Sequence, residues 1–365
     1  METSLHKYFS KLSDPRILRN KKHLLIDIVI LTIIAVICGA ESWDSIELFG
    51  KSKKDFLSKI LRLPNGIPSH DTINRVFSLI HRGKFEKLFT AWVKSIKNKD
   101  ISKEVIAVDG KSLRGSKDSY HEKLPIHVVN AWANSNQLVL GQLKVDGKTN
   151  EITAIPELLE LLDIEGCIVT IDAMGTQKDI AETIIEEKAD YILALKGNQG
   201  YLKEDVESIF NRQSPSTTDE IIEKGHGRIE TRKCEVIDHL DFLEDKDKWK
   251  NLNSLIRIIA KREIKGKETI ESRLYISSIK ANAKDFNSYI RQHWGVENSL
   301  HWILDVTFKE DDQRKRNGKA AENFSLIQKI ALNLLKGEDS KNISIKNKRL
   351  KAAWDNDFLL KILKI

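Results

Sequence analysis

Cysteine is scarce in this 365-residue chain, and the three cysteines, Cys38, Cys167 and Cys234, lie far apart without a C-x-x-C pair. This spacing excludes a disulfide framework and a zinc finger. Proline is also scarce, with 6 residues, and the aromatic content of 7% is ordinary, which argues against a disordered chain. The amino terminus has no apolar stretch of signal-peptide type, so we expect a cytoplasmic protein.

Long hydrophobic runs are nearly absent. The one candidate, residues 24–40, contains Asp27 and falls short of the roughly 20 apolar residues that a membrane-spanning helix needs. We therefore expect a buried helix here and no membrane association.

Charge is plentiful and unevenly distributed. The net charge is +7, and residues 1–103 hold 19 Lys and Arg against 10 Asp and Glu, whereas the centre is mildly acidic and the last 30 residues are basic again. A polyanionic partner contacted by the two ends would explain this pattern. Solvated lysine-rich surfaces would explain the charge equally well.

Residues 1–103 have the apolar periodicity of helices. After the break at Leu63-Pro64-Asn65-Gly66, Ser69 or Asp71 can cap a helix that leaves Arg75 outward. A short helix, a tight turn and a capped second helix are compatible with a helix-turn-helix DNA reader. A plain helical packing domain remains the alternative.

From residue 104 the pattern changes to strands separated by short helices, which predicts an α/β domain with a mixed sheet. Residues 104–200 form its first part, and residues 201–280 alternate β-rich runs with charged turns, as in a β-strand insertion. Residues 281–336 are helical, and residues 337–365 form a basic tail.

Two acidic residues, Asp109 and Asp172, each end an apolar strand and precede a small residue. In α/β sheets, ligand sites usually lie at the carboxyl ends of strands. If the strands are adjacent, the carboxylates converge, and a cation such as Mg²⁺ or Mn²⁺ would offset their repulsion. Taken singly, an Asp after a strand is more often a turn or helix cap.

A third acidic element lies in residues 289–312. On a regular helix, His293, Glu297, His301 and Asp305 recur every four residues and share a face. A carboxylate from this helix would complete a site for two divalent metals that act on a phosphodiester. The alternatives are a zinc site, although the His-Glu-x-x-His pattern is missing, and a solvated helix face without chemistry.

These motifs resemble a known family. The segments VIAVDGKSLRGS, VTIDAMGTQKDIA, YILALKGNQG, EKGHGRIETR and HWGVENSLHWILDVTFKED, in this order, are similar to DDE-type insertion-sequence transposases of the H-repeat-associated group. The resemblance extends from about residue 14 to the carboxyl terminus. It implies an RNase H-like catalytic core with a β-strand insertion, preceded by an α-helical amino-terminal associated domain.

The implied activity is Mg²⁺-dependent cleavage of double-stranded DNA at terminal inverted repeats, followed by strand transfer into target DNA. Two Mg²⁺ (or Mn²⁺) ions per active site, a homodimer in a synaptic complex and a bacterial, nucleoid-associated location are also implied.

The family's catalytic, metal-binding residues match Asp109, Asp172 and Glu297. Related transposases place Tyr, Arg and Lys around their Glu, where this chain has Ile290, His293 and His301. Because of this departure, alternative acidic residues remain open, and these are Asp305 and Asp311.

Further residues are expected to contact DNA because of their charge and placement. Ordinary surface ion pairs or turns could explain each of them as well. The expected residues are Arg75, Lys111, Arg114, Lys196, Asn198, His226 and Arg228, with basic runs at 314–319 and 346–351.

Three functions compete. The first is a transposase that cuts and joins DNA. The second is an RNase H-fold, structure-specific nuclease without strand transfer. The third is a catalytically inactive, transposase-derived DNA-binding protein, which the unusual surroundings of Glu297 motivate.

Overall fold

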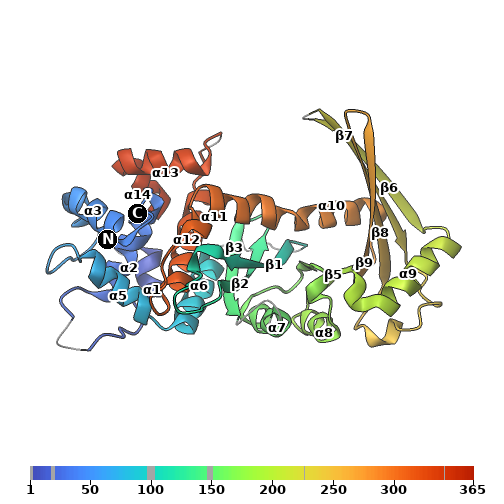
Figure 1. Cartoon of the computed structure of the whole chain (residues 1–365), viewed down its shortest axis with the longest axis horizontal. Helices are drawn as coiled ribbons and strands as arrows, with labels where there is room; N and C mark the ends of the chain where they lie inside the picture. The colour runs from blue at the N-terminus through green and yellow to red at the C-terminus, as the bar shows by residue number, and fades with distance from the viewer. Residues whose placement is uncertain (1–2, 18–20, 97–102, 146–150, 226, 341) are drawn as a thin grey trace.

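The computed structural model describes residues 3–17, 21–96, 103–145, 151–225, 227–340 and 342–365. The molecule is elongated, with a helical body at one end, a sheet in the middle and a projecting β arm at the other end (Figure 1). The first and last described segments of the chain both lie in the helical body (Figure 1). Within the described residues, no helix is both long and apolar enough to cross a bilayer.

Six helices precede the sheet, and α2 is the central one because nearly all of its side chains are buried. Helix α12 packs along α2 and contacts α5 and α6, so chain ends distant in sequence share one core. The helices of this body are α1 (Ser4–Phe9), α2 (Leu25–Ile37), α3 (Trp43–Ser52), α4 (Lys54–Leu57), α5 (His70–Leu79), α6 (Arg82–Ile96) and α12 (Ala320–Lys336).

The helix-turn-helix expectation is only half met. Ser69 does cap α5, because its side chain accepts a hydrogen bond from the Thr72 backbone N–H, and Arg75 is exposed. However, α4 and α5 are separated by residues 58–69 rather than by a tight turn of three to four residues. The structure therefore lacks the short connection that the motif requires.

A nine-stranded mixed sheet forms the centre, in the order β3-β2-β1-β4-β5-β9-β8-β7-β6. Strand β1 pairs antiparallel with β2 and parallel with β4, and β4 pairs parallel with β5. The first five strands are β1 (Val105–Leu113), β2 (Ile126–Ala133), β3 (Leu138–Val145), β4 (Ile168–Ile171) and β5 (Asp190–Leu195). The α/β prediction with a mixed sheet is confirmed.

Helices cover both faces of this part of the sheet (Figure 1). The helices α7 (Glu151–Leu161) and α8 (Lys178–Glu186) lie on one side, where α7 contacts β2 and β3. On the other side α12 contacts β3, and α10 (Ala283–His293) contacts β1 and β4. The apolar strands are consequently buried on both faces, as their continuous apolar runs predict.

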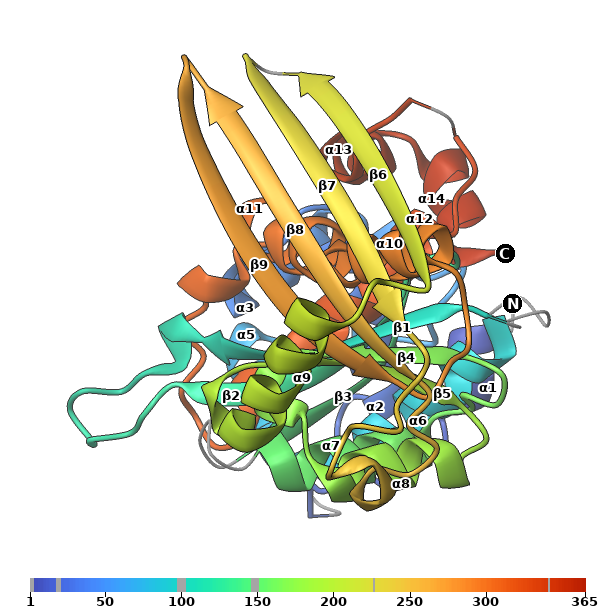
Figure 2. The same ribbon diagram turned by 90° about the vertical axis from the view of Figure 1, so that its right-hand side faces the viewer.

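The last four strands continue the same sheet and form the arm, which rises well beyond the helices (Figure 2). Strand β9 is hydrogen-bonded to β5, so the arm is joined to the centre through a ladder. The segment also contains a helix, α9 (Gly200–Arg212), which the β-only expectation for residues 201–280 missed. The strands are β6 (Thr217–Gly225), β7 (Arg228–Ile237), β8 (Ser254–Ile264) and β9 (Lys267–Ser277).

The carboxyl-terminal residues form two helices, α13 (Ile345–Trp354) and α14 (Asn356–Leu363), rather than a free basic tail. The Arg349 guanidinium is buried and donates to the backbone oxygens of Val36 and Thr307. The Lys348 ammonium donates to the Leu335 carbonyl oxygen at 3.1 Å. These two cations hold α13 on the body, so the expectation that they contact DNA phosphates is wrong.

Candidate active site

Asp109 and Asp172 come from neighbouring parallel strands. Val108 of β1 pairs with Ile171 of β4, so the residue after each of them lies at the same level of the sheet. Asp109 stays within β1, whereas Asp172 ends β4, and its carboxylate accepts hydrogen bonds from the backbone N–H groups of Met174 and Gly175 at 3.1 and 3.4 Å. The turn therefore fixes the position of Asp172.

The pKa of Asp109 reflects the carboxylates around it. Burial, and after it the negative charges of Asp172, Glu297 and Glu151, raise the pKa of Asp109 to about 7, against a backbone hydrogen bond that lowers it. Like charges raise a carboxyl pKa when they lie close without a compensating cation. Two of the acidic residues that the sequence singled out, Asp172 and Glu297, thus act on the third, Asp109.

Glu297 lies in a π-helical turn, Val296–His301, between α10 and α11 (Trp302–Val306). Asn134, the residue after β2, explains this π turn. Its side chain donates to the Gln292 carbonyl oxygen at 2.6 Å. In a regular helix that oxygen would accept from the Val296 backbone N–H. A side chain inserted into this ladder distorts a helix. Gly295 is required here because a Cβ would collide with the Asn134 amide.

The π turn breaks the expected single face of His293, Glu297, His301 and Asp305. Glu297 is exposed, while His301 is turned inward, with Nδ1 lying 3.4 Å from Asp109 Oδ2. His293 Nδ1 instead bonds Thr170 Oγ1 at 3.0 Å. Burial lowers the pKa of both histidines, that of His301 to about 3 with help from Lys111, so both rings are neutral at pH 7.

Lys111 is not free to bind DNA. Its ammonium pairs with Asp305 and, at 2.9 Å, with Glu310, which also binds Lys329 at 3.0 Å. Burial opposes ionisation of Glu310, but the charges of Lys329 and Lys111 lower its pKa to about 2. Asp305 is therefore a partner of Lys111 and is a poor substitute for the third carboxylate.

The other predicted DNA contacts fall into two groups. Arg114 is exposed and pairs with Asp311 at 3.4 Å. This pair also engages Asp311, the second of the two alternative acidic residues. Lys196 and Asn198 are exposed, and Asn198 lies beside Asp172 because its side chain donates to the Ala173 carbonyl oxygen at 2.6 Å.

The remaining predicted contacts lie away from the carboxylates. Arg228 begins β7 on the arm and pairs with Glu230 at 3.1 Å, and Arg75 lies on α5 in the helical body. His226 lies outside the described residues.

Several neighbours of the carboxylates were missed by sequence reasoning. Behind Asp109, Gly110 leaves room for the buried, hydrogen-bonded side chains of His127 and Glu151, with which a Cβ would collide. Asn130 lies directly opposite Asp109 on β2 and is fully buried without a hydrogen-bond partner in the described structure. The sequence does contain a sign that Lys329 is buried and paired, because this lysine interrupts an apolar helical run.

The donor set fits a hard divalent cation, because Asp109, Asp172 and Glu297 offer carboxylate oxygens without a compensating positive charge. Among the described residues, no three His, Cys, Asp or Glu side chains are close enough to hold an ion as they stand. This also leaves the zinc alternative at His293, Glu297 and His301 without support.

Two family models match the chain. A family model described as "Transposase DDE domain" matches residues 100–334, and one described as "DDE_Tnp_1-associated" matches residues 6–93. The chain therefore belongs to the DDE transposase family.

Individual proteins similar to this chain carry transposase names. The chain is 44% identical to "H repeat-associated putative transposase YhhI" of Escherichia coli K12, over 98% of this chain and 97% of that protein. It is 45% identical to "Putative transposase YncI" of Escherichia coli O157:H7, over 99% and 94%. A solved piggyBac transposase synaptic complex with hairpin DNA is similar at a TM-score of 0.45 and 12% identity, over 99% of this chain and 77% of that one. This last similarity is too low to define a fold.

Proposed function

We propose that the protein cuts double-stranded DNA at the terminal inverted repeats of its element and transfers the strand into target DNA, with Asp109, Asp172 and Glu297 as its catalytic carboxylates. One observation carries this proposal: Asp172 and Glu297 both raise the pKa of the half-buried Asp109. A carboxylate whose pKa is raised by burial and by nearby like charges is typical of a functional site.

The sheet supports an RNase H-like core. Its first five strands have the order β3-β2-β1-β4-β5, with β1 to β3 antiparallel and β4 and β5 parallel to β1. In this core the two aspartates would lie on the central strands, and the helix after the insertion would bring Glu297 to them.

Asp109, Asp172 and Glu297 would hold two Mg²⁺ or Mn²⁺ ions. When bound, such ions activate the attacking oxygen and stabilise the leaving oxygen of a phosphodiester. The chain's own contribution is positional: the Met174 and Gly175 N–H groups orient Asp172, and the neutral His301 ring lies against Asp109. Glu297, exposed on its π turn, is free to approach when the ligand arrives.

The DNA partners in this proposal are the element's terminal repeats and a target duplex, with Lys196 and Asn198 beside the scissile phosphate. Two ends require two active sites, so we infer a homodimer in the synaptic complex, working at the bacterial nucleoid.

The test is cleavage of duplex DNA carrying the element's own ends, with Mg²⁺, Mn²⁺ or EDTA. We expect metal-dependent cutting by the wild type and none by Asp109→Asn, Asp172→Asn or Glu297→Gln, with DNA binding retained. Asp179→Asn, an exposed carboxylate in the first turn of α8, is the matched control and should cut normally.

Other outcomes would overturn specific parts. Normal cutting by Glu297→Gln would remove Glu297 from the triad. Cutting without joining of a pre-cleaved end would favour the nuclease alternative. Binding without any cutting by the wild type would favour the inactive DNA-binding alternative.

A further inference from the structure

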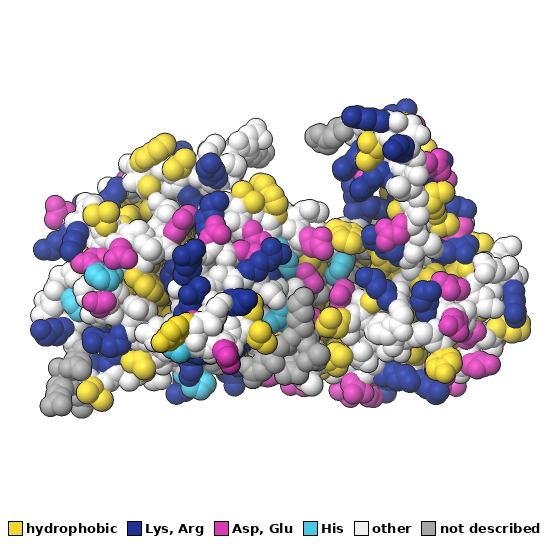
Figure 3. Space-filling view, in the orientation of Figure 1, with side chains coloured by type: hydrophobic (Ala, Val, Ile, Leu, Met, Phe, Trp, Pro, Cys, Tyr) yellow, Lys and Arg dark blue, Asp and Glu magenta, His cyan; other side chains and the backbone are white. Residues whose placement is uncertain are grey.

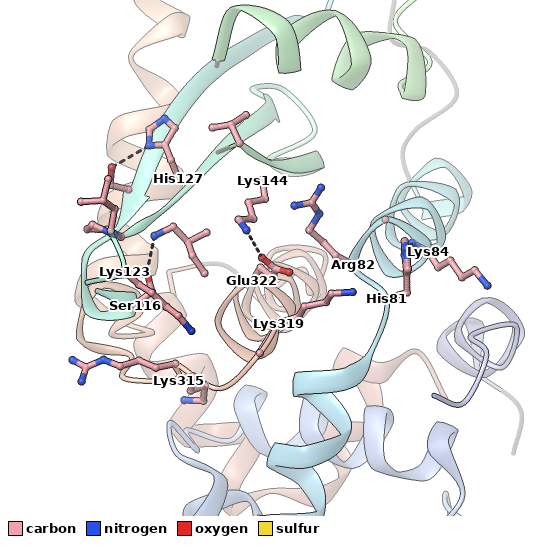
Figure 4. Close-up of a pocket in the computed structure, with 18 of the residues that line it drawn as sticks. His81, Arg82, Lys84, Ser116, Lys123, His127, Lys144, Lys315, Lys319 and Glu322 are labelled. Carbon is pink, nitrogen blue, oxygen red and sulfur yellow. Dashed lines mark hydrogen bonds and ion pairs between the residues drawn. The ribbon is translucent and has the colours of Figure 1, made fainter. Parts of the chain in front are cut away.

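A basic cavity lies at the far end of the β1–β2 hairpin, between the helical body and the sheet (Figure 4). Its volume is about 1240 Å³. Four parts of the chain contribute to its wall: the start of α6, the segment from β1 to β2, the end of β3 with α7, and the residues around the start of α12. Figure 3 shows Lys and Arg side chains gathered on this face between the helical body and the sheet.

The wall is strongly positive. Eight cationic side chains line it against two carboxylates, Glu157 and Glu322. One carboxylate, Glu322, is paired with Lys144 at 3.5 Å. The cations are Arg82, Lys84, Lys87, Lys123, Lys144, Lys315, Arg316 and Lys319.

Most of this charge is not used by the fold. Arg82 lies 3.5 Å from Glu86, and Lys315 is buried against the Phe324 ring and donates to the Glu41 carbonyl oxygen. By contrast, Lys87, Lys123 and Lys319 are exposed, and none of them lies within ion-pair distance of a described carboxylate. Uncompensated cations held together in a concave surface attract a polyanion.

The chemistry of the wall selects charge rather than base sequence. Six of the eight cations are lysines, which act as point charges toward phosphate. The described lining residues include no Asn or Gln, which read adenine, and no Phe, Tyr or Trp ring on which a base could stack.

The cavity is close to the carboxylates but separate from them. Ser112 and His127, which are hydrogen-bonded to each other at 3.0 Å, line its upper end. Ser112 is three residues beyond Asp109 on β1, so it lies about 10 Å along the strand and on the opposite face of the sheet. This distance corresponds to about three base pairs of a duplex.

We propose that this basic cavity binds the phosphodiester backbone of duplex DNA without reading its sequence, as a second DNA site distinct from the carboxylates. The proposal rests on the proposed function for its choice of polyanion. A target duplex of any sequence is the DNA that suits such a site.

The test measures binding in EDTA, where no cutting occurs, to a random-sequence duplex and to a duplex carrying the element's end. The variant is the triple substitution Lys87→Gln, Lys123→Gln and Lys319→Gln. Its matched control is Lys178→Gln, Lys284→Gln and Lys361→Gln, which replaces three exposed lysines outside the cavity. Both variants are checked for unchanged thermal unfolding.

We expect the cavity variant to bind both duplexes more weakly by the same factor, and its plot of log K against log salt to become shallower by about 2–3. The control should match the wild type. Wild-type binding and salt slope in the cavity variant, or an equal loss in the control, would overturn the proposal. Because binding is measured without metal, a wild type that never cuts would contradict the proposed function and leave this result intact.

Discussion

Asp109 and Lys111 lie two residues apart on the same face of β1, yet their surroundings are opposite in kind. Asp109 faces other carboxylates, and its pKa is raised to about 7 by burial and by those charges. Lys111 faces Glu310 and Asp305 in an ion network in which Glu310 and Lys329 are fully buried and matched in charge. The negative charges around Asp109 are not matched by a cation among the described residues, whereas those around Lys111 are matched by Lys111 and Lys329. In the proposed function the repelled carboxylates do the chemistry, and the matched charges hold the fold together.

The largest effect is expected where the matched network is broken. Glu310→Gln leaves Lys111 and Lys329 buried without their shared counter-charge, so the free energy of unfolding should fall by about 3–5 kcal/mol. Urea unfolding at pH 7 measures it. Asp109→Asn is the control, and it should cost no stability because it removes a repelled charge. A loss below about 1 kcal/mol for Glu310→Gln would show that the network is dispensable.

Glu86 on α6 is another buried carboxylate with a raised pKa. It allows the cost of an unmatched buried charge to be measured as a change of stability with pH. Burial raises its pKa to about 7, even though Arg82 lowers it. A raised carboxyl pKa means that the folded state holds the proton more tightly, so stability is lost as pH rises from about 4.5 through 7. Glu86→Gln should remove this loss and be more stable than the wild type by about 2–3 kcal/mol at pH 8 but not at pH 4. Thermal unfolding at both pH values measures it, and an equal difference at both would contradict it.

Supplying the cation should stabilise the carboxylate group. A divalent ion at ten times its Kd adds about 1.4 kcal/mol to the free energy of unfolding. We expect Mg²⁺ or Mn²⁺ to raise the Tm of the wild type and to leave that of Asp109→Asn unchanged. An equal rise in Glu310→Gln would confirm that the two groups are independent, and an equal rise in Asp109→Asn would place the ion elsewhere.

The smallest effect is expected at the exposed pair of Arg114 and Asp311, which lies near the buried network but in solvent. Arg114→Ala should cost less than about 1 kcal/mol, because water and salt screen such pairs. Urea unfolding in low and high salt measures it. A cost as large as that of Glu310→Gln would mean that exposure does not separate the two kinds of pair.

Local sequence patterns predicted what local forces determine. The ranges of β1 and β2 follow from their apolar runs, and α7 and α8 follow from their amphipathic periodicity. Strand β6 was missed because it is exposed along its length and has no apolar face to reveal it. The π turn at Glu297 was missed because its cause, Asn134, lies far away in sequence.

Ion pairs between residues far apart in the sequence could not be predicted from the sequence either. In the sequence, the position of Lys111 beside Asp109 suggests that it contacts phosphate. In the folded chain it is paired instead with Glu310, which lies 199 residues away in the sequence. The acidic residues themselves could be picked out because each follows an apolar run or lies in a motif. What their charges do depends on which side chains the tertiary fold places around them.

The hydrogen-bonded join between β5 and β9 also limits how the arm can vary over evolutionary time. Because the arm continues the central sheet, a change at its base would shift the register of β5 and with it the turn that holds Asp172. At the outer turn, where Ile264 pairs with Lys267, strands can be lengthened or shortened by two residues each without altering any side chain's face. Differences in arm length among related proteins should therefore occur at the outer turns of the arm, while the pairing between β5 and β9 at its base stays unchanged.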